Sequence, residues 1–277
     1  MCEASRNGLA VGFFDGVHRG HQAILANASS VLTFRNHPLS VLAPSRAPRL
    51  IMSVEDRLAA IAACGVSDVR ALDFTPELAA LSPDDFIARY VRERKVFCGG
   101  NWNFGRGGVG NAAYLRSRGI NAEVVSYADY EGQPISSTRI RAALAEGRIA
   151  AAVAMLGHPW RMRGEVVLGK GVGRTIGFPT INLKPMEGLV QPPCGVYEVR
   201  LNGTKGIANY GFAPTMGAQA WAEPTLEVHL LMPPSAAPTV GESLAVEICR
   251  FIRPERKFNN LEDLQRQIAS DCDTIIP

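Results

Sequence analysis

The first half of the chain alternates between short apolar runs and longer stretches that carry helix signals. Ser53 and Ser82 each precede acidic residues at the start of such a stretch, which is the pattern of a capped helix. Four apolar runs have the length of buried parallel strands. They are Leu9–Phe14, Ser30–Phe34, Val69–Phe74 and Val96–Cys98. Strands and helices in alternation predict a doubly wound α/β sheet, which binds ligands at the carboxyl ends of its strands.

From residue 158 onward the pattern changes to short strands separated by turns. Val196–Leu201 and Thr204–Ala208 flank an Asn-Gly pair, which is the signal of a type I′ hairpin. Asn260 then caps a closing helix with an apolar stripe on one side. Several short antiparallel strands followed by one helix predict a small closed barrel.

The length of 277 residues suits one large or two ordinary domains. An alanine-rich helix is expected over Ile149–Leu156, and His158-Pro159 ends it. We therefore predict one domain over residues 1–157 and a second over residues 158–277.

A glycine-rich stretch in the second half has the character of a phosphate-binding loop. Its glycines, among them Gly169 and Gly173, carry no side chain, so backbone N–H groups can converge on phosphate oxygens. Lys170 and Arg174 supply positive charge in the same stretch. A glycine-rich surface hairpin is the alternative interpretation.

Candidate ligands and a candidate base follow this stretch. Thr180 and Asn182 are two residues apart, so on a strand their side chains face one way. A hydroxyl and an amide oxygen suit Mg²⁺ that is held jointly with a nucleotide, which favours a nucleotide site over a hairpin. Leu226–Leu230 alternates and places Glu227 on the face opposite the leucines. Glu227 is a general base if that face lines the nucleotide site, and a solvated strand residue otherwise.

Two histidines follow the first predicted strand. The Asp15-Gly-Val-His-Arg-Gly-His21 turn leads into a helix expected over residues 22–28. A strand-to-helix turn offers free N–H groups and a positive dipole end to phosphate. His18 and His21 are three apart and share a face at a helix start, where imidazoles can donate to phosphate oxygens during phosphoryl or nucleotidyl transfer. Metal ligation and an ordinary surface role are the alternatives.

Two more segments of the first half carry polar groups that suit a nucleotide. Gly99–Asn111 is a second glycine-rich loop, with two aromatic residues. Ile135–Arg141 opens the last helix of this half, and Ser137 and Arg141 lie four apart on one face. Hydroxyls, free N–H groups and a guanidinium together can grip a triphosphate. A serine-capped helix with solvated arginines is the alternative.

The bulk composition narrows the class of protein. The net charge of +3 is too small to imply a nucleic-acid partner. The six cysteines are scattered without a Cys-x-x-Cys pair, so we expect reduced thiols and a cytoplasmic location. The chain has neither a basic-then-apolar leader nor an apolar run of membrane length, so we expect no membrane partner.

Taken in order, the motifs of this chain resemble those of the bacterial bifunctional riboflavin kinase/FAD synthetase family over nearly the whole length. The matching segments are Phe14–His21, Gly99–Gly105, Ile135–Arg141, Gly177–Leu183, Gly206–Asn209 and Leu226–Leu230. The resemblance implies an N-terminal, α/β doubly wound, nucleotidylyltransferase-like domain that adenylylates FMN. It also implies a C-terminal riboflavin kinase domain, a six-stranded antiparallel β-barrel with a C-terminal helix. Riboflavin and ATP would give FMN and ADP, and FMN and ATP would give FAD and pyrophosphate.

The resemblance also implies roles for individual residues. His18 and His21 match the histidines that contact ATP phosphates and stabilise adenylyl transfer, and Glu227 matches the proposed base for the riboflavin 5′-hydroxyl. Thr180 and Asn182 match the pair that binds Mg²⁺ with ATP. The positions implied for ATP and its phosphates are Gly12, Phe13, Asp15, Asn101, Ser137, Thr138, Arg141, Gly169, Lys170, Gly173 and Thr180. Those implied for the flavin are Asn209 and Arg174.

Three segments depart from the family pattern. The segment from Gln22 to Val31 is short, so the first helix is expected to be clipped. Gly211–Thr215 lacks an arginine before Pro-Thr, and Pro233–Thr239 replaces an Asp-Leu-Tyr-Gly stretch, both on the flavin side of the kinase. Two other functions are therefore alternatives to the bifunctional enzyme: an adenylyltransferase without kinase activity, and a flavin- or nucleotide-binding regulator without turnover.

Overall fold

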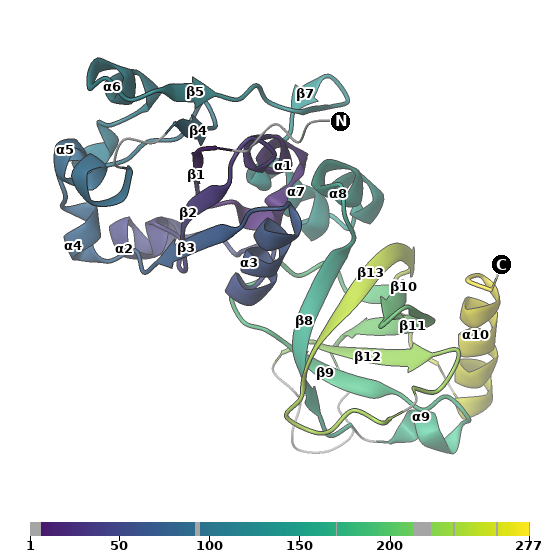
Figure 1. The fold of residues 1–277 in the computed structure, drawn as a ribbon. Helices are drawn as coiled ribbons and strands as arrows, with labels where there is room; N and C mark the ends of the chain where they lie inside the picture. The colour runs from purple at the N-terminus through teal and green to yellow at the C-terminus, as the bar shows by residue number, and fades with distance from the viewer. Residues whose placement is uncertain are drawn as a thin grey trace. The chain divides into compact units, whose positions relative to one another are not determined.

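The computed structural model describes residues 7–91, 95–169, 171–212, 223–234, 236–258 and 260–276 (Figure 1). The chain forms two compact units. Unit 1 contains Met1–Arg139 and Met155–Gly157, and unit 2 contains Ile140–Ala154 and His158–Pro277. The segment Met155–Gly157 is held in unit 1 by Gln22, whose side-chain amide donates to Leu156 O and to Val17 O, both at 2.8 Å.

Unit 1 is built on a five-stranded parallel sheet in the order β3-β2-β1-β4-β5. Its central strands are buried except at the half-buried Phe34, as expected for a parallel sheet covered on both faces, and the edge strands are partly exposed. The strands are β1 (Leu9–Val11), β2 (Ser30–Phe34), β3 (Asp68–Leu72), β4 (Val96–Cys98) and β5 (Ala122–Val124). The doubly wound sheet predicted from the sequence is confirmed, and β5 was missed because it is three residues long with two of them exposed.

Short helices connect these strands. Ser53 and Ser82 cap theirs as predicted, each accepting a hydrogen bond at 3.1 Å from a backbone N–H three residues on. These connecting helices are α1 (Arg19–Leu25), α2 (Leu39–Leu42), α3 (Val54–Ala63), α4 (Pro76–Ala79), α5 (Pro83–Phe86) and α6 (Ala112–Ser117). Two more helices, α7 (Ser137–Ala145) and α8 (Ile149–Leu156), follow the last strand of the sheet and belong mostly to unit 2. A π-helical turn over Ile87–Val91 extends α5, and 3₁₀ turns lie at Asp15–Val17, Pro44–Arg46 and Arg106–Gly108. The two-stranded hairpin of β6 (Asp129–Tyr130) and β7 (Gln133–Pro134) precedes α7.

The first helix begins earlier than predicted. We expected it over residues 22–28, but α1 spans Arg19–Leu25. The reason is a local cap, because His18 Nδ1 accepts a hydrogen bond from the backbone N–H of His21. His21 therefore lies in the first turn of α1, and the helix is seven residues long.

Unit 2 is a closed six-stranded antiparallel barrel in the order β10-β11-β12-β9-β8-β13, as predicted. Its strands are β8 (Trp160–Val167), β9 (Ile181–Pro185), β10 (Gly195–Leu201), β11 (Thr204–Gly211), β12 (Thr225–Leu230) and β13 (Ser243–Arg253). Asn202 and Gly203 both have positive φ, which confirms the type I′ hairpin between β10 and β11. Buried residues such as Tyr197 and Val228 fill the barrel.

Two helices accompany the barrel. The short α9 (Val172–Thr175) lies within the glycine-rich stretch, and α10 (Leu261–Asp273) closes the chain (Figure 1). Cys272 of α10 and Ile275 pack on Val196 and Ile207, which point out of the barrel. Among the described residues, no helix combines the length and apolar character needed to cross a bilayer, and the described cysteines are all free thiols.

Candidate active sites

A tight turn at the carboxyl end of β1 forms the first site. Phe14 and Val17 have positive φ angles of 59° and 39°, which are uncommon for non-glycine residues and concentrate at functional sites. Gly12 precedes the turn, and a Cβ there would lie 3.0 Å from the Phe14 ring. Gly16 has φ of 81°, and its missing side chain leaves room for Ile51. The backbone is therefore bent where parallel sheets bind ligands.

Asp15 joins this turn to two distant segments. Its carboxylate is buried and accepts a hydrogen bond from the backbone N–H of Ile51 at 3.0 Å. Its carbonyl oxygen accepts one from the Ser137 hydroxyl at 2.9 Å. The sequence motifs around residues 15 and 137 thus meet in space, and the Ser137 hydroxyl proton is donated to the backbone of the turn.

His18 and His21 stack on each other with ring centroids 3.6 Å apart and an interplanar angle of 18°. Because His18 Nδ1 accepts from the His21 backbone N–H, the neutral His18 ring carries its proton on Nε2. The His21 ring also meets Phe14 edge-on at 5.2 Å. The pKa of His21 is held well below 6.5, mainly by burial and further by the nearby His18 and Arg57. His21 is therefore a neutral imidazole at physiological pH, and its Nδ1 has no hydrogen-bond partner among the described residues.

Arg57 on α3 is a buried cation that we did not predict. Its guanidinium lies 3.9 Å from the centroid of the Phe13 ring, and Nη2 donates to the carbonyl oxygens of Phe34 and Arg35. Nε and Nη1 have no partner in the described part of the chain. Burial lowers the pKa of Arg57 to about 10, so it remains charged. The sequence did carry one indication that Arg57 is buried: it lies four residues before the apolar Ile61 of α3, and residues i and i+4 share a helix face.

The other residues predicted for the nucleotide site of the first half of the chain lie on loops and on α7. Asn101 is exposed beside Gly99, and the hydroxyl of Tyr127 lies against Gly100. Thr138 is exposed, and Arg141 is half-buried on the same face of α7 as Ser137. The neighbouring Arg139 is used differently, since it donates to three backbone carbonyls around the β6–β7 hairpin.

The second site is a row of polar side chains on the outside of the barrel. Glu227 of β12 stands directly opposite Asn182 of β9 on one side and Asn209 of β11 on the other. Directly opposed residues in antiparallel strands point to the same face. The flanking Leu226 and Val228 are 1% exposed and point into the barrel. Glu227 therefore lies in a polar row, which favours the general-base interpretation over an isolated solvated residue.

The glycine-rich stretch lies against one end of this row. A Cβ on Gly169 would be 2.2 Å from Nδ2 of Asn182, and one on Gly173 would be 2.3 Å from the carbonyl oxygen of Phe178. Asn182 Nδ2 in turn lies 3.4 Å from Thr180 Oγ1, so the two predicted metal ligands do share a side. Arg174 is exposed on α9, and Lys170 lies outside the described residues.

The donor set at Thr180 and Asn182 fits Mg²⁺ in one particular way. Among the described residues, no three His, Cys, Asp or Glu side chains gather to hold a metal. A neutral hydroxyl and a neutral amide oxygen instead suit a Mg²⁺ ion that takes its remaining ligands from nucleotide phosphates and water.

Asn209 has a partner that the sequence did not reveal. Its Nδ2 donates to Oε1 of Glu255 at 2.9 Å, across 46 residues of chain. Glu255 belongs to none of the motifs above, so only the folded barrel brings it to this face.

Comparison with known proteins identifies both units. Residues 2–139 match the family profile described as FAD synthetase, and residues 156–276 match that described as riboflavin kinase. A bifunctional riboflavin kinase/FMN adenylyltransferase from Escherichia coli K12 is 36% identical, with 95% of this chain and 90% of the relative covered. The protein of that name from Bacillus subtilis 168 is 32% identical, with 97% and 91% covered.

A solved structure shows the same fold. It is named as a macrolide-efflux protein from Streptococcus pneumoniae and aligns with a TM-score of 0.81 and 28% identity. The alignment covers 98% of this chain and 94% of the other. The word efflux belongs to the name of that protein, and we infer only the shared fold from the alignment.

Proposed function

The chain belongs to the family of bifunctional riboflavin kinase/FMN adenylyltransferases, and we propose how its residues divide the two reactions. The enzyme phosphorylates riboflavin to FMN and adenylylates FMN to FAD. We assign adenylylation to residues 1–157 and the kinase to residues 158–277, in keeping with the family profiles that match each part. ATP is the second substrate of both reactions, with ADP and pyrophosphate as the respective products.

In adenylyl transfer, the turn after β1 meets the α-phosphate of ATP. His18 presents its Nε2 proton to a phosphate oxygen, because Nδ1 is occupied by the helix cap. His21, neutral and stacked on His18, stabilises the negative charge that develops on the α-phosphate during transfer. The Ser137 hydroxyl is bonded to the turn, and we assign Thr138 and Arg141 to the phosphates that leave. Asn101 contributes from its loop on the adenosine side.

In the kinase reaction, Glu227 accepts the proton of the riboflavin 5′-hydroxyl as that oxygen attacks the γ-phosphate. Thr180 and Asn182 are the residues that would hold Mg²⁺, which would supply charge neutralisation on the nucleotide phosphates. We assign Gly169, Gly173 and Lys170 to the phosphates, although Lys170 lies outside the described residues, and we assign Arg174 and Asn209 to flavin binding. Free thiols and the use of ATP support a cytoplasmic location.

The observation that carries the kinase assignment is the register that aligns Asn182, Glu227 and Asn209 on one face. The test is a pair of reciprocal variants. Glu227→Gln keeps the shape and removes the base, so FMN formation should fall by about 10²–10⁴ while FMN adenylylation persists. His21→Asn should do the opposite and lower FAD formation by about 10²–10³. Both rates come from incubation with riboflavin or FMN and MgATP, followed by chromatographic separation. Near-normal FMN formation by Glu227→Gln would refute the base assignment.

A further inference from the structure

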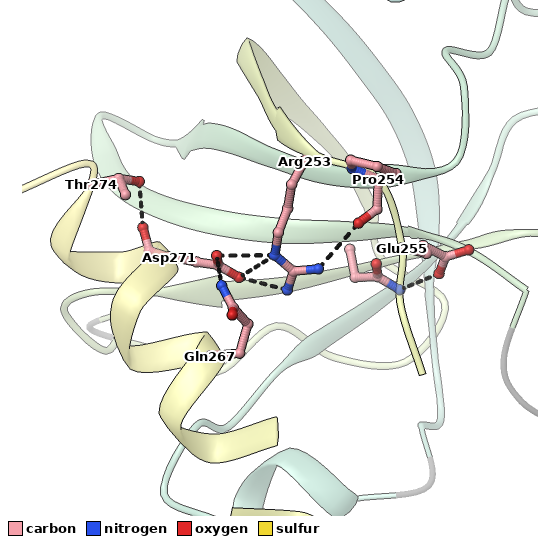
Figure 2. Close-up of polar contacts among 7 residues, drawn as sticks. Arg253, Pro254, Glu255, Gln267, Asp271 and Thr274 are labelled. Carbon is pink, nitrogen blue, oxygen red and sulfur yellow. Dashed lines mark hydrogen bonds and ion pairs between the residues drawn. The ribbon is translucent and has the colours of Figure 1, made fainter. Parts of the chain in front are cut away.

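The C-terminal helix determines where Glu255 lies. Arg253, at the end of β13, donates through Nε to both carboxylate oxygens of Asp271 at 3.0 Å and through Nη2 to Oδ2 at 2.7 Å (Figure 2). Gln267 Nε2 donates to Asp271 Oδ1 at 2.7 Å. Arg253 Nη1 also donates to the carbonyl of Pro254 at 3.2 Å. The peptide that carries Glu255 is thus tied to α10 through one guanidinium.

Glu255 reaches from this anchor across to β11. Its carboxylate lies against the backbone of Gly211, where a Cβ would be 2.0 Å from Oε1. The same oxygen accepts from Asn209 Nδ2 at 2.9 Å. Asn209 and Gly211 are two apart on one strand and share the outer face, so the carboxylate sits over both.

A carboxylate partner settles which way the Asn209 amide points. An ionised carboxylate only accepts hydrogen bonds, so the amide nitrogen must face Glu255. Oδ1 must then face away from it, and Oδ1 has no hydrogen bond to any other described residue. Asn209 therefore presents a hydrogen-bond acceptor, not a donor, beside Glu227, which stands opposite it across the strand pair. Directly opposed Cβ atoms are about 5 Å apart, so the two side chains can reach neighbouring groups of one ligand.

We propose that Glu255 is a positioning residue for the riboflavin kinase reaction, which orients Asn209 so that Oδ1 accepts a hydrogen bond from a ribityl hydroxyl next to the reacting one. This rests on the proposed assignment of Glu227 as the base for the 5′-hydroxyl. The contact selects flavins that carry the hydroxylated side chain, because an analogue without it leaves a site acceptor unpaired. The contribution is to riboflavin binding and leaves phosphoryl transfer itself to Glu227.

Two variants of the full-length enzyme test the proposal by different routes. Glu255→Gln replaces the carboxylate by an amide that can face Asn209 with either atom, so Asn209 is free to turn. Gly211→Ala keeps the carboxylate but displaces it, because the overlapping atoms are the end of a flexible side chain. For each, we expect the riboflavin KM of FMN formation to rise about fivefold with kcat nearly unchanged. Glu187→Gln, an exposed glutamate elsewhere in the same unit, is the matched control.

A second readout separates the ribityl contact from a merely structural role. Lumiflavin carries a methyl group in place of the ribityl chain, and its inhibition constant against riboflavin should be unchanged in both variants. Melting temperature and FMN adenylylation should also match those of wild type. An unchanged riboflavin KM, an equal loss of lumiflavin affinity, or a fall in kcat alone would overturn the proposal. If Glu227→Gln abolishes FMN formation while Glu255→Gln leaves KM unchanged, the inference fails and the base assignment stands.

Discussion

Replacing Gly169 by alanine tests whether the glycine-rich stretch holds Asn182 where the kinase needs it. A Cβ on Gly169 would lie 2.2 Å from Asn182 Nδ2, whereas ordinary contact begins at 3.4 Å, so the amide must move by about 1.2 Å. The atoms that the new Cβ overlaps are those at the end of the Asn182 side chain, so the Asn182 amide moves and the backbone stays in place. Misplacing a positioning group by about 1 Å costs about 10² in rate, or about 2.7 kcal/mol. We expect that loss in FMN formation and none in FMN adenylylation.

The assay is the same two-substrate measurement with MgATP, followed by separation of FMN from FAD. Leu168→Ala is the control, because this neighbouring side chain is 77% exposed. Gly169→Ala and Asn182→Ala should not add, since both act on one amide. Kinase turnover within about twofold of wild type, or a double variant that loses the sum of both effects, would show that the stretch does not position Asn182.

Two further predictions concern stability. Because burial, His18 and Arg57 hold the pKa of His21 below 6.5, the unfolded chain binds more protons than the folded one just under that pH. Wild-type melting temperature should therefore fall as the pH drops from about 6.5 toward the lowered folded-state pKa of His21, and His21→Asn should flatten that slope; an identical slope would contradict a neutral, buried His21. Arg253→Met leaves the Asp271 carboxylate, whose side chain is 4% exposed, with Gln267 as its remaining side-chain partner among the described residues, and should cost about 3 kcal/mol in urea unfolding. A change under about 0.5 kcal/mol would mean that the ion pair does not anchor α10.

The features that the sequence revealed are those set by neighbouring residues. Strand runs, the caps at Ser53 and Ser82 and the Asn-Gly hairpin depend on chemistry within a few positions. The structure confirms the caps and the hairpin and has a strand at each predicted run, although β1 ends at Val11 and not at Phe14. The barrel and its closing helix followed from the same local signals, together with the family motifs. The start of α1 was misplaced because a histidine side chain, an unusual cap, begins it.

The arrangement of the sites was decided by contacts between residues far apart in the chain. Ser137 meets Asp15 across 122 residues, and Glu255 meets Asn209 across 46. The i, i+4 spacing of Arg57 from Ile61 indicated a shared helix face, but only the folded unit showed that Arg57 itself is buried. Local sequence determines which elements form, because it sets backbone preferences and capping. Only the tertiary structure determines which polar groups are buried together, because desolvation and charge act between groups that the chain itself does not place side by side.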